Sequence, residues 1–113
     1  MTATDNDRAF LHRSDQLVDA LIAQLDHCDP DEVEAEMSQG VLKLTFGDGS
    51  RCILNRQSAV HQMWLAEGAT AWHFSFDAAQ SAWLDTKGRG ELTAILSAIL
   101  GKKLGRPFAL QPQ

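Results

Sequence analysis

Apolar residues recur at helical spacing in two segments, one near each end of the chain. Between residues 7 and 28 they are separated by seven, four, four and three positions, which predicts an amphipathic helix with one apolar face: Phe10, Leu17, Leu21, Leu25 and Cys28. A second helix is predicted from residue 91 to the lysines at 102 and 103, with a similar apolar face: Leu92, Ile95, Leu96, Ile99 and Leu100.

The residues between these helices alternate between apolar and polar, as expected for half-buried strands. Asp48-Gly49 is a hairpin dipeptide, which predicts a type I′ turn because both central residues of that turn need positive φ. Six strands are predicted, at residues 32–37, 41–46, 51–57, about 60–66, 72–76 and 82–84.

The order of helix, strands and helix predicts an α+β fold. Hairpin-length links favour antiparallel pairing, and two amphipathic helices can cover only one face of such a sheet. We therefore expect a single domain over residues 1–113, built as a two-layer α–β sandwich with both helices on one face of about six strands.

The charge of the chain is unevenly distributed. Residues 1–36 contain ten acids and two arginines, a net charge of −8, whereas residues 37–113 contain five acids and eight bases, a net charge of +3. This distribution disfavours nucleic acid and anionic membranes as partners, and favours cations or a basic protein surface. Residues 1–7 do not resemble a secretory signal, and the two cysteines are predicted to be reduced, so a cytoplasmic location is expected.

The acids of the first third form a candidate site for metal ions. Asp15, Asp19 and Asp26 share one side of the first predicted helix, and Glu34 and Glu36 alternate along the first strand. Open sites of carboxylate oxygens suit hard cations and bind them weakly. The alternative is that these acids are merely solvated, which is the commonest role of charges on an outer face. The candidate metal ligands are Asp15, Asp19, Asp26, Asp29, Asp31, Glu32, Glu34 and Glu36.

A second candidate surface lies on the predicted sheet. Asn55 and Gln57 share one side of the third strand, and Gln62 and Trp64 share the same side of the fourth. An indole among carboxamides on a solvated face is typical of a protein-binding surface. The alternative is that Trp64 packs under the loop at residues 67–70.

Two neighbouring residues complete this surface. Arg56 lies between Asn55 and Gln57, so its side chain is predicted to point to the opposite face of the strand. We expect it to reach round the strand end to a carboxylate or a partner. His73 lies between Trp72 and Phe74, which are predicted to face the core, so it should be exposed. The candidate partner-binding residues are Asn55, Arg56, Gln57, Gln62, Trp64 and His73.

Seven segments of the chain match the pattern of one known family: Asp15-Gln16-Leu17, Gly40-Val41-Leu42 to Phe46, Asp48-Gly49-Ser50, Asn55-Arg56-Gln57, His61-Gln62-Met63-Trp64-Leu65-Ala66, His73-Phe74 and Trp83. In these segments the sequence resembles the frataxin family, most closely its bacterial branch. The chain departs from bacterial members at Ile22 and Ala23, where they typically carry further acids, so the number of metal sites does not follow from the resemblance.

This resemblance implies a non-enzymatic role in iron–sulfur cluster assembly. Frataxins bind iron, as Fe²⁺ or Fe³⁺, weakly through surface carboxylates, and they dock onto the cysteine desulfurase and its scaffold protein. The implied function is an iron-binding regulator, iron donor or iron sensor, monomeric or in metal-driven oligomers. Two alternatives remain open, namely a protein-binding adaptor whose acids serve only solubility, and a weak ferroxidase. The sequence lacks the E-x-x-H spacing of di-iron sites.

Overall fold

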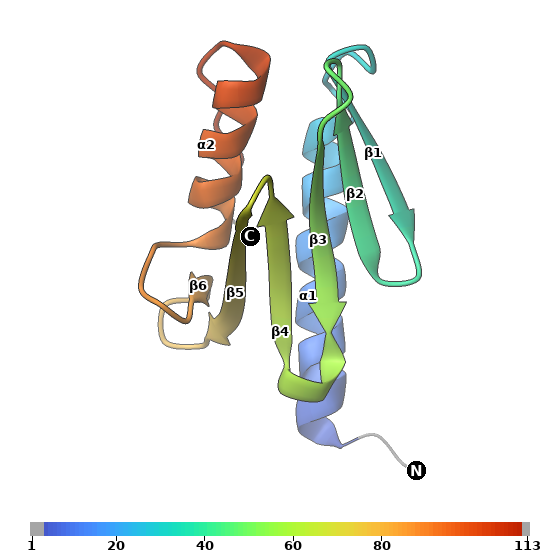
Figure 1. Ribbon diagram of the computed structural model, residues 1–113. Helices are drawn as coiled ribbons and strands as arrows, with labels where there is room; N and C mark the ends of the chain where they lie inside the picture. The colour runs from blue at the N-terminus through green and yellow to red at the C-terminus, as the bar shows by residue number, and fades with distance from the viewer. Residues whose placement is uncertain (1–3, 112–113) are drawn as a thin grey trace.

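The computed structural model describes residues 4–111 and contains two helices and six strands (Figure 1). Their order is α1 (Asp5–Leu25), β1 (Val33–Ser38), β2 (Val41–Phe46), β3 (Arg51–Gln57), a 3-10 turn η1 (Ser58–Val60), β4 (Gln62–Glu67), β5 (Thr70–Asp77), β6 (Ala82–Asp85) and α2 (Leu92–Leu104). The predicted domain of 1–113 begins and ends outside the described residues, so its extent stays a prediction. Neither described helix is long and apolar enough to cross a membrane.

The sheet is a meander in which each strand pairs antiparallel with the next along the chain, in the order β1 to β6. Every second residue of each strand points toward the helices. These residues pack against the apolar faces of α1 and α2 in a single core. Leu42, Leu54 and Leu65 face one another across β2, β3 and β4, and each is at most 2% exposed. The predicted α+β sandwich is therefore confirmed.

The aromatic residues of β5 and β6 divide between the core and its border. Phe74 and Trp83 are buried, as expected, whereas Trp72 and Phe76 are half-buried and pack against the core. Met37 shares the inward parity of Val33 in the first predicted strand, but it is 42% exposed, so the prediction that it faces the core is wrong. It lies near the end of the edge strand β1, where the β1–β2 hairpin lies to one side of α1 (Figure 1).

The type I′ signature occurs in a different turn from the one predicted. Gln39 and Gly40, between β1 and β2, have φ of +51° and +80°. In the predicted pair only Gly49 has positive φ, and Gly49 N–H and Phe46 N–H bond to Phe46 O and Ser50 O respectively. This pattern is typical of a longer hairpin loop that closes with one left-handed glycine.

The fourth strand begins later than predicted because η1 precedes it. His61 follows η1 in a left-handed conformation with φ of +53°. Its ring stacks on Phe10 of α1 at 5.0 Å, and its Nε2 lies 2.7 Å from Asp7 Oδ1. The hydrogen bond from His61 lowers the pKa of Asp7 to about 2. These contacts fix the first turns of α1 against the β3–β4 connection.

The segment after α2 returns to the helical layer. Leu110 is buried, and its N–H donates to Ser97 Oγ of α2 at 2.8 Å. Gln24 near the end of α1 bonds both the N–H and the carbonyl of Gln111, at 2.6 and 3.1 Å. Residues 106–111 therefore join the C-terminal part of α1 to the middle of α2.

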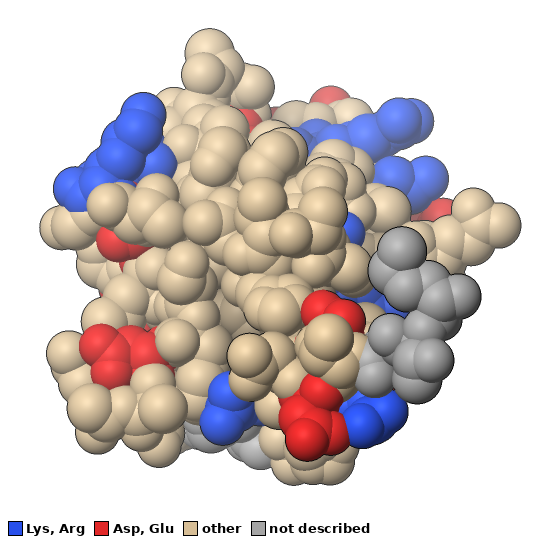
Figure 2. Space-filling model, turned by 90° about the horizontal axis from the view of Figure 1, so that it is seen from below, with Lys and Arg blue, Asp and Glu red and all other residues tan. Residues whose placement is uncertain are grey.

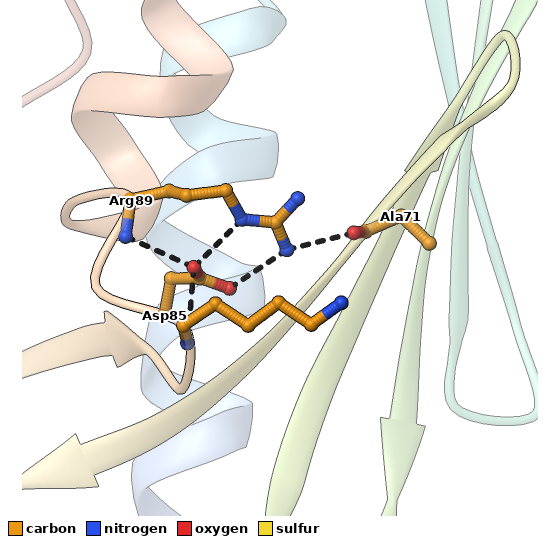
Figure 3. A network of polar contacts seen from close by, with 4 residues as sticks. Ala71, Asp85 and Arg89 are labelled. Carbon is orange, nitrogen blue, oxygen red and sulfur yellow. Dashed lines mark hydrogen bonds and ion pairs between the residues drawn. The ribbon is translucent and has the colours of Figure 1, made fainter.

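An ion pair between a buried carboxylate and an exposed arginine lies at the other edge of the sheet. Asp85, the last residue of β6, is fully buried in its side chain and pairs with Arg89 at 2.8 Å. Asp85 Oδ2 also accepts the N–H groups of Lys87 and Arg89, and Arg89 Nη2 donates to the carbonyl of Ala71 on β5 (Figure 3). These bonds from Arg89 lower the pKa of Asp85 to about 2. The network ties the β6–α2 loop to the neighbouring strand.

Candidate functional site

The solvated face of the sheet carries a row of three candidate residues. Asn55, Trp64 and His73 face one another across β3, β4 and β5. The rings of Trp64 and His73 stack, with centroids 4.1 Å apart and planes 9° from parallel. The sequence therefore places these three side chains correctly on one surface, which we call the amide–indole face (Asn55, Gln57, Gln62, Trp64 and His73).

The indole of Trp64 is fixed by its neighbours and remains half-buried. Its Nε1–H donates to Gln62 Oε1 at 2.8 Å, and Gln62 Nε2 donates to Ser75 Oγ at 3.4 Å. Within residues 4–111, none of its hydrogen bonds or ring contacts involves the loop at 67–70. His73 was predicted to be exposed, but it is half-buried because the indole covers one side of its ring.

Arg56 lies on the opposite side of the sheet from the amide–indole face. Its Nη1 donates to Asp15 Oδ1 at 2.7 Å and lies 3.4 Å from Ser14 Oγ, both on α1. Its side chain is 25% exposed, so its contacts are mainly with the helix. Arg56 therefore pairs with a carboxylate, which is one of the two expected outcomes. The carboxylate of Asp15 accordingly has a partner within the protein.

The remaining acidic candidates lie on α1, in the following loop and on β1. Glu32 pairs with Arg106, Glu36 lies 3.5 Å from Lys43, and Asp29 accepts the N–H of Asp31. The other four are exposed, and their carboxylates make no hydrogen bond or ion pair within residues 4–111: Asp19, Asp26, Asp31 and Glu34. We call residues 26–36 the acidic edge; Asp15 and Asp19 lie on α1, apart from it.

Backbone contacts position the acidic edge. Gly47 N–H donates to Glu32 O at 3.1 Å, and a Cβ at Gly47 would lie 2.6 Å from Asp31 O. The N–H groups of Glu32 and Val33 both donate to Asp29 O. Only a residue without a side chain fits at Gly47, so the β2–β3 turn and the acidic edge pack closely.

The acidic edge fits weak binding of cations better than an enclosed metal site. In the part of the chain that the structure describes, no three His, Cys, Asp or Glu side chains lie close enough together to hold one ion. Exposed carboxylates retain their water and can bind hard cations in pairs or through water. Burial raises the pKa of Cys52 to about 12, which disfavours a thiolate ligand there.

Glu34 and Glu36 lie on the same solvated face as Trp64. Glu36 faces Lys43, Lys43 faces Ile53 and Ile53 faces Ala66, in the row next to Trp64. The acidic edge begins near the C-terminal end of α1, at the top of Figure 1. Seen from below, the opposite end has a mostly uncharged centre, with acidic and basic side chains mixed around its rim (Figure 2).

Two structural features were missed by the sequence analysis. Ser14 is fully buried within the apolar face of α1. It lies four residues after Phe10 and four before Val18, and this helical spacing could have indicated its burial. Asp85 shares the inward parity of Trp83, and Arg89 follows four residues later. An acid at an inward position indicates a buried partner, and a nearby arginine is the obvious one.

Comparisons with known proteins agree with this geometry. Residues 3–106 match the model of the frataxin-like domain. The chain is 38% identical to the iron–sulfur cluster assembly protein CyaY of Delftia acidovorans, over 93% of this chain and 95% of the relative. The protein of the same name from Cupriavidus metallidurans is 39% identical, over 86% and 85% respectively.

Two solved structures support the same relationship. Frataxin from Psychromonas ingrahamii, a CyaY family protein, superposes with a TM-score of 0.83 at 25% identity, covering 93% of this chain and 97% of the other. Trimeric frataxin from the yeast Saccharomyces cerevisiae, complexed with ferrous iron, gives a TM-score of 0.64 at 25% identity, covering 94% and 91%.

Proposed function

The chain belongs to the frataxin family, and on that premise we propose that it acts in iron–sulfur cluster assembly. In this proposal it is an iron-binding regulator, iron donor or iron sensor that binds the cysteine desulfurase and its scaffold protein. The observation that carries the proposal is Trp64, an indole held by Gln62 and His73 on a solvated sheet face.

Trp64 supplies the apolar part of the proposed interface. Aromatic anchors dominate the binding energy of many protein interfaces, particularly where neighbouring groups fix their orientation. The surrounding carboxamides offer donors and acceptors without the desolvation cost of a full charge. Because Trp64 is already oriented in the free protein, little side-chain entropy is lost when a partner covers it.

The acidic edge supplies the electrostatic part. Its unpartnered carboxylates attract a basic partner surface, and Glu34 and Glu36 extend the negative charge onto the face that carries Trp64. Such attraction mainly increases the rate of association and weakens as salt screens it. The same oxygens are proposed as weak ligands for iron or other divalent cations. The ferrous complex of the yeast relative supports iron as the cation.

The test is to measure binding of purified cysteine desulfurase and scaffold protein at low and high salt. We expect Trp64→Ala to weaken binding at least about tenfold at both salt concentrations. Glu34→Lys should weaken it at low salt only, because its effect is electrostatic. Asp5→Lys, at the start of α1, changes the net charge equally and serves as the control. Undiminished binding by both Trp64→Ala and Glu34→Lys would overturn the proposal.

A second candidate function is a protein-binding adaptor without physiological metal binding. The absence of any three-ligand group within residues 4–111 favours it. Titration with Fe²⁺ under anaerobic conditions, followed by NMR line broadening, separates the two candidates. Broadening confined to residues 15–36 supports iron binding, whereas none there favours the adaptor. Oxygen consumption above that of iron alone would instead support the ferroxidase alternative.

A further inference from the structure

Arg13 lies beside a hollow that belongs to neither proposed surface. This hollow has a volume of about 270 Å³, lies between α1 and the β5–β6 hairpin, and is lined by Arg13, Gln16, Leu17, Phe76, Ser81 and Trp83. Leu17 and Trp83 are buried and form apolar walls, while Gln16 and Ser81 are exposed and polar. The hollow therefore offers both an apolar floor and a polar rim.

Arg13 is half-buried, but its guanidinium has no acceptor among the residues that the structure describes. Its central carbon lies 4.5 Å from the centroid of the Phe76 ring, and it makes no hydrogen bond or ion pair within residues 4–111. Arg56, Arg89 and Arg106 differ, since each pairs with a carboxylate. Arg51 also lacks such a partner among the described residues, but it is exposed to water. Arg13 thus retains five N–H donors at a partly desolvated position.

The charges around the hollow favour a small anion of single charge. No acid is among its six lining residues, so the positive charge of Arg13 is not neutralised locally. Asp19 is exposed two positions after Leu17, and the chain has a net charge of −5, so a dianion would be repelled more strongly. A carboxylate matches the planar fork of a guanidinium, and the apolar walls suit a compact organic body.

We infer that this hollow binds a small organic monocarboxylate, with the carboxylate on Arg13 and the apolar body against Leu17, Phe76 and Trp83. A second hollow of equal volume lies on the other side of Arg13 and is lined in part by Val60 and His61. His61 is bonded to Asp7, which places a carboxylate close to that hollow. The anion is therefore assigned to the side with Ser81 and Trp83.

Benzoate is a suitable probe, with benzamide as its neutral analogue of the same shape and inorganic phosphate, in mildly alkaline buffer where it is doubly charged, as a dianion. We expect benzoate to shift the backbone amide signal of Ser81 and the indole signal of Trp83, with a dissociation constant on the order of millimolar. Benzamide and phosphate should bind at least about tenfold more weakly. Shifts centred on Val60 and His61, or equal binding of benzamide, would overturn the inference.

Arg13→Gln should weaken benzoate binding at least about tenfold, because a charge-assisted hydrogen bond is lost. Arg51→Gln removes an exposed arginine from β3 and is the matched control, so its benzoate binding should be unchanged. Thermal unfolding of both variants checks that the fold is intact. Equal benzoate binding by the two variants would also overturn the inference. None of these measurements involves the desulfurase or iron, so failure here is distinct from failure of the proposed function.

Discussion

Asp85 on β6 and Glu34 on β1 are both acids on edge strands of the same sheet, but their surroundings differ. The side chain of Asp85 is fully buried and accepts hydrogen bonds from Lys87 and Arg89. Glu34 is exposed, and its carboxylate has no partner within residues 4–111. The β6 edge uses its acid to hold a loop in place, whereas the β1 edge leaves its acid to the solvent.

This difference separates a carboxylate that contributes to stability from one that is available to a ligand. A carboxylate whose lone pairs are filled by protein donors cannot coordinate an ion without losing those bonds. An exposed carboxylate contributes little to stability, and neighbouring like charges even oppose folding slightly. Substitution of the acid should therefore destabilise the protein strongly at the β6 edge and hardly at all at the β1 edge.

The largest expected effect is at Asp85. Asp85→Asn removes the charge and turns an amide N–H₂ toward the guanidinium of Arg89, so we expect the free energy of unfolding to fall by about 3 kcal/mol. Chemical denaturation with urea at neutral pH measures it. Asp77→Asn is the matched control, since among the described residues Asp77 accepts only the N–H of Gln80, and it should cost less than about 1 kcal/mol. Equal losses in the two variants would contradict the comparison.

The contribution of Asp85 should also depend on pH. Its pKa is lowered from 3.8 to about 2 by the bonds from Arg89, so the folded state binds this proton less readily than the unfolded state. The stabilisation is therefore complete above pH 4 and is lost as the pH falls toward 2. We expect the difference in unfolding free energy between the wild type and Asp85→Asn to shrink over this range. A constant difference would show that Asp85 acts by shape alone.

A smaller effect is expected at Gly47, which positions the acidic edge. An added methyl group would lie 2.6 Å from Asp31 O, so Gly47→Ala requires the backbone to shift and should cost about 1–2 kcal/mol. The amide NMR signals of Asp31 and Glu32 should move, while those of Trp64 and His73 should not. Unchanged signals at Asp31 and Glu32 would mean that the close packing does not position the acidic edge.

The smallest effect on stability is expected at the β1 edge itself. Glu34→Gln combined with Glu36→Gln should change the free energy of unfolding by less than about 0.5 kcal/mol, because the side chains are exposed and Glu36 has only a long ion pair with Lys43. The same double substitution should reduce Fe²⁺ line broadening at residues 31–36 severalfold. Asp5→Asn, a neutralised acid at the start of α1, should leave that broadening unchanged. A large loss of stability would place Glu34 or Glu36 in a structural role.

The sequence predicted the features that depend on local alternation. Leu42, Leu54 and Leu65 have the strand parity that places them in the core, and the same parity places Trp64 beside Asn55. These predictions succeed because the period of a strand fixes which face each residue occupies. Alternation, hairpin-length links and two amphipathic helices also predicted the sandwich and its six strands.

Asp85 and Ser14 carried local signals, but the other features that were missed depend on contacts between distant segments. Asp15 and Arg56 are 41 positions apart, so nothing local indicates that this acid is paired while Asp19 is not. The exposure of Met37 depends on how far the helical layer extends sideways over β1, and the stacking of His73 depends on the rotamer of Trp64. Parity assigns a residue to a face, but it does not determine what covers that face.

The meander order of the sheet has a consequence for the protein during its synthesis. Each strand pairs with the one made immediately before it, so hairpins can form in the order in which the ribosome produces them. The helical layer is different, because α2 and the buried Leu110 follow the six strands along the chain. The core of the nascent chain therefore stays open on that side until residue 110 has left the ribosome.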